Sequence, residues 1–75
     1  MIVDDEMLAR IHIRSMLNWE DLGFRICGEY SDGKQAMENI PLLKPDIVIT
    51  DIKMKYVNGD ELVRFIYQKY PSIKV

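Results

Sequence analysis

The stretch Ile47–Thr50 is β-prone throughout and apolar except at its last position. A strand with apolar side chains on both faces is typical of the buried, central part of a parallel sheet, because helices cover both faces of such a sheet. An acid, Asp51, follows this stretch directly, and a second apolar run at Met1–Val3 also ends in acid, at Asp4 and Asp5. These two runs constrain the fold more than any other feature of the chain.

Helical and strand-like patterns alternate along the rest of the sequence. Apolar spacing predicts helices from Met7 to about Leu17, from about Lys34 to Leu43 and from Asp60 to Tyr70, and alternation predicts a strand over Phe24–Tyr30. A turn at Ser31–Gly33 is expected to cap the second helix. The residues expected to face the core from the helices are Ala9, Ile13, Met16, Leu17, Ala36, Met37, Ile40, Leu62, Val63, Ile66, Tyr67 and Tyr70.

With Ile73–Val75 beginning a further strand, the predicted order is β-α-β-α-β-α-β. Strands that alternate with helices indicate an α/β fold, with a parallel sheet and right-handed crossovers.

Charge and composition exclude several classes of protein. The formal net charge is -2, so the sequence offers no basic face of the kind that binds nucleic acid. A single cysteine, Cys27, cannot form an internal disulfide. The acidic first residues do not resemble a signal peptide, and no apolar run is long enough to span a bilayer. We expect a cytoplasmic, soluble chain.

The two strands that end in acid predict a binding site. Ligands of open parallel sheets bind outside the carboxyl ends of the strands, and neighbouring strands lie about 4.8 Å apart. If the two strands are adjacent, Asp4, Asp5 and Asp51 converge, and carboxylates this close repel one another unless a cation neutralises them. Oxygen ligands in a partly open site favour Mg²⁺ over zinc, and Asp51 could then accept a phosphoryl group. The simpler alternative is that each acid only favours the start of a helix.

Four segments together resemble the receiver domain of bacterial two-component response regulators: Ile2–Glu6, Ser31–Ala36, Pro45–Met54 and Asn58–Gly59. The resemblance covers essentially the whole chain. It implies a flavodoxin-like (CheY-like) parallel sheet with helices on both faces, truncated after about three strands and three helices. Residues 1–75 would be the N-terminal portion of a single receiver domain, whose second half and output domain are absent.

The resemblance also implies roles for individual residues. Asp51 would be the phosphoacceptor, Asp5 would ligate Mg²⁺ directly, and Asp4 would act through a metal-bound water. The backbone carbonyl of Lys53 would be a further ligand. The partner would be a sensor histidine kinase, and the receiver would not be an enzyme acting on a separate substrate.

The stretch Trp19–Phe24 resembles receivers joined to AraC-type helix-turn-helix output domains. This implies regulation of transcription, with DNA contacted through the output domain and not by this chain.

Two departures from the family pattern are visible. Lys55 stands where the family usually has proline. The Ser/Thr and Lys that would follow the fourth and fifth strands have no counterpart. The strand at Ile47–Thr50 would therefore have a bare outer edge, so we predict a chain that is unstable alone or that pairs with another copy.

Two other functions are open at this point. An aspartyl-nucleophile hydrolase or phosphotransferase usually has a second acid two residues after the nucleophile, where this chain has Lys53. A swapped structural fragment with a vestigial acidic pocket is the other alternative.

Overall fold

The computed structural model describes residues 1–52, 54 and 58–75. Strands and helices alternate in the predicted order. The elements are β1 (Ile2–Val3), α1 (Met7–Met16), β2 (Glu29–Tyr30), α2 (Gly33–Leu43), β3 (Ile49–Thr50) and α3 (Gly59–Lys69).

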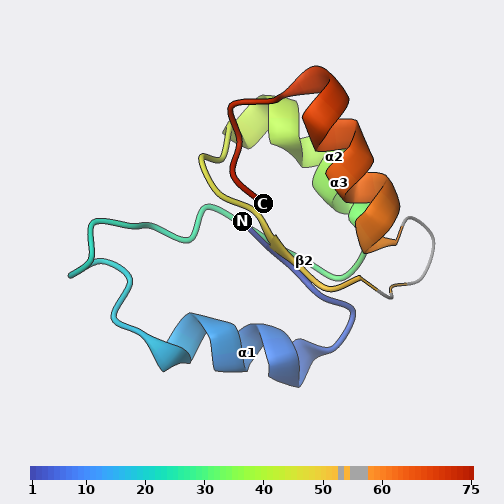
Figure 1. The fold of residues 1–75 in the computed structure, drawn as a ribbon. Coiled ribbons are helices and arrows are strands. Elements are labelled where there is room, and N and C mark those ends of the chain that lie inside the picture. Colours follow the sequence, from blue (N-terminus) through green and yellow to red (C-terminus); the bar gives the residue numbers. More distant parts are fainter. Residues whose placement is uncertain (53, 55–57) are drawn as a thin grey trace.

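The strands form one parallel sheet in the order β2-β1-β3. Ile2 lies opposite Glu29 on one side and Ile49 on the other, which sets the register of both pairs. Helix α1 covers one face of the sheet, while α2 and α3 cover the other (Figure 1). The predicted α/β architecture, with helices on both faces, is confirmed.

The core lies between the sheet and the α2–α3 layer. Asp32 caps α2 as predicted, since its Oδ1 accepts from the backbone N–H of Gln35 at 2.8 Å. The predicted stripe of α3 is wrong at Tyr67, which is 70% exposed, whereas Phe65 packs against the core. The fully buried side chains of this layer include four of those predicted from the helices: Ala36, Ile40, Leu62 and Ile66.

The third strand is less buried than its sequence predicted. Val48 is fully buried on the α2–α3 side, but Ile49 is 36% exposed. Ile49 shares the α1 face with its neighbour Ile2, because side chains alternate along a strand. Ile2 is covered, whereas none of the described elements covers Ile49 to the same extent. The strand is therefore apolar on both faces without being buried on both.

The outer edge of β3 begins to acquire a fourth strand. Ile47 forms a parallel bridge with Lys74, in which the Val48 N–H donates to the Lys74 carbonyl at 2.8 Å. The strand-like character predicted for Ile73–Val75 is thus realised at one position. Pairing of this edge with another copy stays a prediction.

Helix α1, which the structure describes throughout, has no buried side chain. Ala9 and Ile13 are half-buried, but Met16 and Leu17 are exposed, so their predicted core role is wrong. The apolar spacing marks one side of this helix, but the side is not fully covered.

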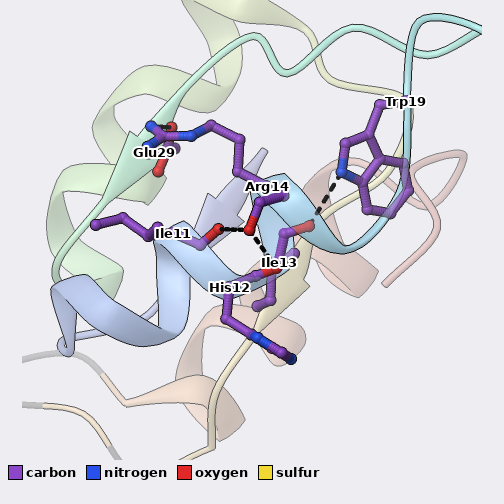
Figure 2. A network of polar contacts seen from close by, with 7 residues as sticks. Ile11, His12, Ile13, Arg14, Trp19 and Glu29 are labelled. Carbon is purple, nitrogen blue, oxygen red and sulfur yellow. Dashed lines mark hydrogen bonds and ion pairs between the residues drawn. The ribbon is translucent and has the colours of Figure 1, made fainter.

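Two polar contacts connect α1 with β2 and with the segment that follows the helix (Figure 2). Arg14 forms a 2.8 Å ion pair with Glu29 of β2. The indole N–H of Trp19 donates to the carbonyl of Ile13 at 3.1 Å, near the end of the helix.

None of the described helices is long and apolar enough to cross a membrane.

The strand predicted over Phe24–Tyr30 is much shorter, since only Glu29 and Tyr30 pair with β1. Residues 24–27 lie outside the ladder that Glu29 and Tyr30 form with Ile2 and Val3. Phe24 packs edge-on against Trp19 instead, with ring centroids 6.2 Å apart. Gly23, with φ of +87°, makes the turn between them, in the backbone region that favours glycine.

Candidate metal and phosphoacceptor site

The structure brings Asp4, Asp5 and Asp51 together at the carboxyl ends of β1 and β3. Each offers a carboxylate oxygen, and these oxygens all lie within 4.8 Å of one another. Asp4 is half-buried, while Asp5 and Asp51 are exposed to solvent. The cluster is therefore accessible to a ligand from solution.

The sheet ladder fixes where the acids stand. The backbone N–H of Asp51 donates to the carbonyl of Val3 at 3.0 Å, and the N–H of Asp4 donates to the carbonyl of Tyr30 at 3.0 Å. Both strands thus end at the same level of the sheet. The side chains beyond that level project into one volume because the strands are parallel and adjacent.

Local hydrogen bonds orient two of the carboxylates. The Oδ1 of Asp4 accepts from the backbone N–H of Glu6 at 3.0 Å. The Oδ1 of Asp51 accepts from the N–H of Ile52 at 2.8 Å. One oxygen of each carboxylate thereby accepts a backbone N–H.

The chemistry of this donor set fits Mg²⁺. Within residues 1–52, 54 and 58–75, no lysine or arginine forms an ion pair with Asp4, Asp5 or Asp51. Three clustered carboxylates that have no ion-pair partner among the described side chains favour a cation, and the all-oxygen set suits a hard one. Lys53 and Lys55, named from the sequence, lie outside the described residues.

The start of α3 packs against the backbone of the Asp51 segment. The N–H of Gly59 donates to the carbonyl of Ile52 at 2.8 Å. A Cβ added at Gly59 would collide with the Asp51 carbonyl oxygen and would lie 2.6 Å from the Cα of Ile52. Asn58 caps the helix by accepting from the N–H of Glu61 at 3.0 Å. Gly59 thus permits the start of α3 to approach the backbone of Asp51 closely, and this contact positions the Asp51 segment relative to the helix.

Sequence reasoning missed this role of Gly59 and placed it in the preceding loop. The capping residue Asn58 marks where the helix begins, but no local pattern shows that residue 59 meets the Asp51 backbone. Sequence reasoning also missed Arg10, whose guanidinium Nη1 donates to the backbone carbonyl of Asp4 at 2.6 Å.

A separate hollow of about 340 Å³ lies near the amino ends of the strands. Met1, Ile2, Trp19, Phe24 and Ile47 are among the residues that line it. Its lining includes none of the three clustered aspartates, so it is distinct from the acidic site.

Comparison with known families decides the classification. The response regulator receiver domain matches the chain over residues 1–75. The chain belongs to this family. The resemblance found in the sequence is therefore confirmed, and the receiver has the parallel sheet and the strand-end acids described above.

Individual relatives agree with the receiver assignment. The transcriptional regulatory protein DegU of Brevibacillus brevis is 36% identical over 75 residues, which are 100% of this chain and 31% of DegU. The REC domain of AraT, a response regulator from Geobacillus stearothermophilus, superposes with a TM-score of 0.91 at 28% identity, covering 96% of this chain and 56% of that one.

A two component transcriptional regulator AraC from Clostridium phytofermentans gives a TM-score of 0.89 at 35% identity, covering 99% of this receiver and 57% of that chain. The receiver thus spans about a third of the curated relative DegU and just over half of the two solved chains.

Proposed function

We propose that Asp51 is the phosphoacceptor of this receiver and that Asp4 and Asp5 hold Mg²⁺ beside it. The observation that carries the proposal is the convergence of three carboxylate oxygens within 4.8 Å, at the ends of neighbouring parallel strands. Asp51 directly follows β3; its carboxylate is exposed, and its backbone N–H donates to the carbonyl of Val3, which supports the accessibility and positioning that phosphoryl transfer requires.

The proposed transfer uses the carboxylate of Asp51 and the backbone N–H of Ile52. An oxygen of the Asp51 carboxylate attacks phosphorus, the new O–P bond forms, and the bond from phosphorus to the donor breaks. The electron pair of that bond leaves with the donor group. The N–H of Ile52 holds Oδ1 of Asp51, so the carboxylate meets the donor in a fixed orientation. When bound, Mg²⁺ would neutralise the charge that develops on the phosphoryl oxygens.

The ligands proposed for Mg²⁺ are Asp4, Asp5, Asp51 and the backbone carbonyl of Lys53. The half-buried carboxylate of Asp4 already accepts from Glu6, which suits contact through a metal-bound water. The exposed carboxylate of Asp5 suits direct ligation.

The partner proposed for this receiver is a sensor histidine kinase in the cytoplasm. Similarity to the two component transcriptional regulator of Clostridium phytofermentans supports an output that controls transcription, with DNA bound by that output and not by the receiver. The receiver would assist its own phosphorylation and would turn over no separate substrate.

The proposal is tested by incubating the chain with Mg²⁺ and acetyl phosphate and measuring its intact mass. One phosphoryl group is expected on the parent chain and none on Asp51→Asn. Asp46→Asn is the matched control, because Asp46 is also exposed but precedes β3 in the chain, whereas Asp51 follows it. It should be phosphorylated like the parent.

Phosphorylation that persists in Asp51→Asn, or that survives removal of Mg²⁺ with EDTA, would overturn the assignment. Steady turnover of a phosphomonoester would favour the hydrolase alternative. Absence of both labelling and Mg²⁺ binding would favour a vestigial pocket.

A further inference from the structure

Arg10 reaches back from α1 to the acidic loop. Its guanidinium Nη1 donates to the backbone carbonyl of Asp4 at 2.6 Å, in a partly buried contact between residues six apart. Its backbone N–H donates to the carbonyl of Glu6 at 3.2 Å. The backbone bond is the ordinary i→i−4 hydrogen bond of the first helical turn, so the side-chain contact with Asp4 is the one specific to Arg10.

The contact falls where the sheet stops supporting the chain. The N–H of Asp4 still donates to β2, but β1 itself ends at Val3. Beyond the end of the strand, the Asp4 carbonyl accepts a hydrogen bond from the Arg10 guanidinium. Since this carbonyl belongs to the peptide that joins Asp4 to Asp5, fixing it restricts the direction in which the Asp5 side chain leaves the backbone.

We propose that Arg10 is the positioning residue of the metal site: it fixes the Asp4–Asp5 peptide and so sets the place of both carboxylates for a divalent cation. This inference rests on the proposed function of the acidic pocket. Arg10 itself donates and carries positive charge, so it is no ligand. Removing a residue that orients a metal ligand without touching the metal typically changes the metal affinity about 10–100-fold.

Arg14 provides a matched control. It lies one turn further along the same helix, carries the same charge and forms an ion pair with Glu29 of β2 (Figure 2). Arg10→Met and Arg14→Met each remove one positive charge and one anchor of α1. They differ in the loop contact, which belongs to Arg10.

The affinity for Mg²⁺ alone is measured by calorimetry, without a phosphoryl donor. Arg10→Met should weaken binding about tenfold, Arg14→Met should leave it unchanged, and Arg10→Lys should recover part of the loss because it keeps a donor and the charge. Equal affinities for the two methionine variants would overturn the proposal. Tighter binding by Arg10→Met would also overturn it, since that result would mean that charge repulsion outweighs positioning.

Amide hydrogen exchange without metal provides a second readout. The N–H groups of Asp5 and Glu6 should exchange faster in Arg10→Met than in Arg14→Met. Unchanged exchange at these amides would contradict the role of Arg10 whether or not Mg²⁺ binds. A parent chain that binds no Mg²⁺ would refute the metal site, and the exchange data would still decide whether Arg10 orders the loop.

Discussion

Gly59, the first residue of α3, lies directly against the backbone carbonyl of Asp51. This contact joins the start of a helix to the proposed phosphoacceptor without any side chain between them. The helix can approach so closely because residue 59 has no Cβ. The position of Asp51 therefore depends on the identity of a residue eight positions later in the chain.

Replacing Gly59 by alanine should damage both stability and phosphorylation. The added Cβ forces the helix and the Asp51 segment apart, and overpacking of this kind costs about 1–3 kcal/mol. Urea unfolding and acetyl phosphate labelling would measure the two effects. Gln68→Ala, at the exposed far end of α3, is the control and should change neither. Normal labelling of Gly59→Ala would show that Asp51 does not depend on this contact.

Asp5→Asn should stabilise the chain when divalent cations are absent. The three clustered carboxylates repel one another in the folded state, and removing one charge should raise the free energy of unfolding by up to about 1 kcal/mol. Addition of Mg²⁺ should reverse the order, because ligand binding stabilises the parent chain more than the variant.

Urea unfolding in EDTA and in Mg²⁺ measures this crossover. Asp46→Asn, which alters an exposed acid away from the cluster, should show no crossover. If Mg²⁺ stabilises the parent and Asp5→Asn equally, Asp5 is not a ligand.

Ile66→Ala should be severely destabilising, and Tyr67→Ala should be nearly neutral. Ile66 is 1% exposed in the α2–α3 core, whereas Tyr67 is 70% exposed. Truncating a buried isoleucine typically costs about 2–5 kcal/mol, while exposed positions stay within about 0.5 kcal/mol. Comparable losses for both variants in chemical denaturation would contradict the exposure of Tyr67.

Asp32→Ala should lower the free energy of unfolding by about 1 kcal/mol, because it removes the side-chain cap of α2. Ser31→Ala, at the exposed neighbouring position, is the comparison and should have little effect. A loss of helical circular dichroism confined to Asp32→Ala would accompany the change. Equal behaviour of the two variants would mean that the cap contributes nothing measurable.

Much of the fold followed from local patterns in the sequence. The order of elements, the cap at Asp32 and the burial of Ala36 and Ile40 all depend on short-range spacing and turn chemistry, which the sequence displays directly. The meeting of Asp4 with Asp51 required one further inference, that strands ending in acid are neighbours in a parallel sheet.

The features that the sequence did not predict depend on which elements lie beside one another in the fold. Periodicity identifies side chains that share a face, but it does not say whether anything covers that face, so Met16 and Tyr67 were placed in the core and are exposed. Phe24 has strand-like character, but none of the described strands pairs with it. The contacts of Arg10 and Gly59 arise where a helix returns to a loop, and no local pattern announces such an approach.

The absence of buried side chains in α1 has a consequence for how the receiver opens. A helix without a fully buried side chain is expected to detach from the sheet at a lower free energy than global unfolding, as a separate cooperative unit. Arg10 belongs to this unit, and its guanidinium donates to the Asp4 carbonyl. Each such opening would therefore break this hydrogen bond and free the acidic loop from α1. A cation bound by the carboxylates would, by thermodynamic linkage, hold α1 closed. Whether the pocket holds a cation would thus affect how often α1 opens, and α1 lies on the opposite side of the sheet from α2 and α3. The guanidinium of Arg10 would connect the two.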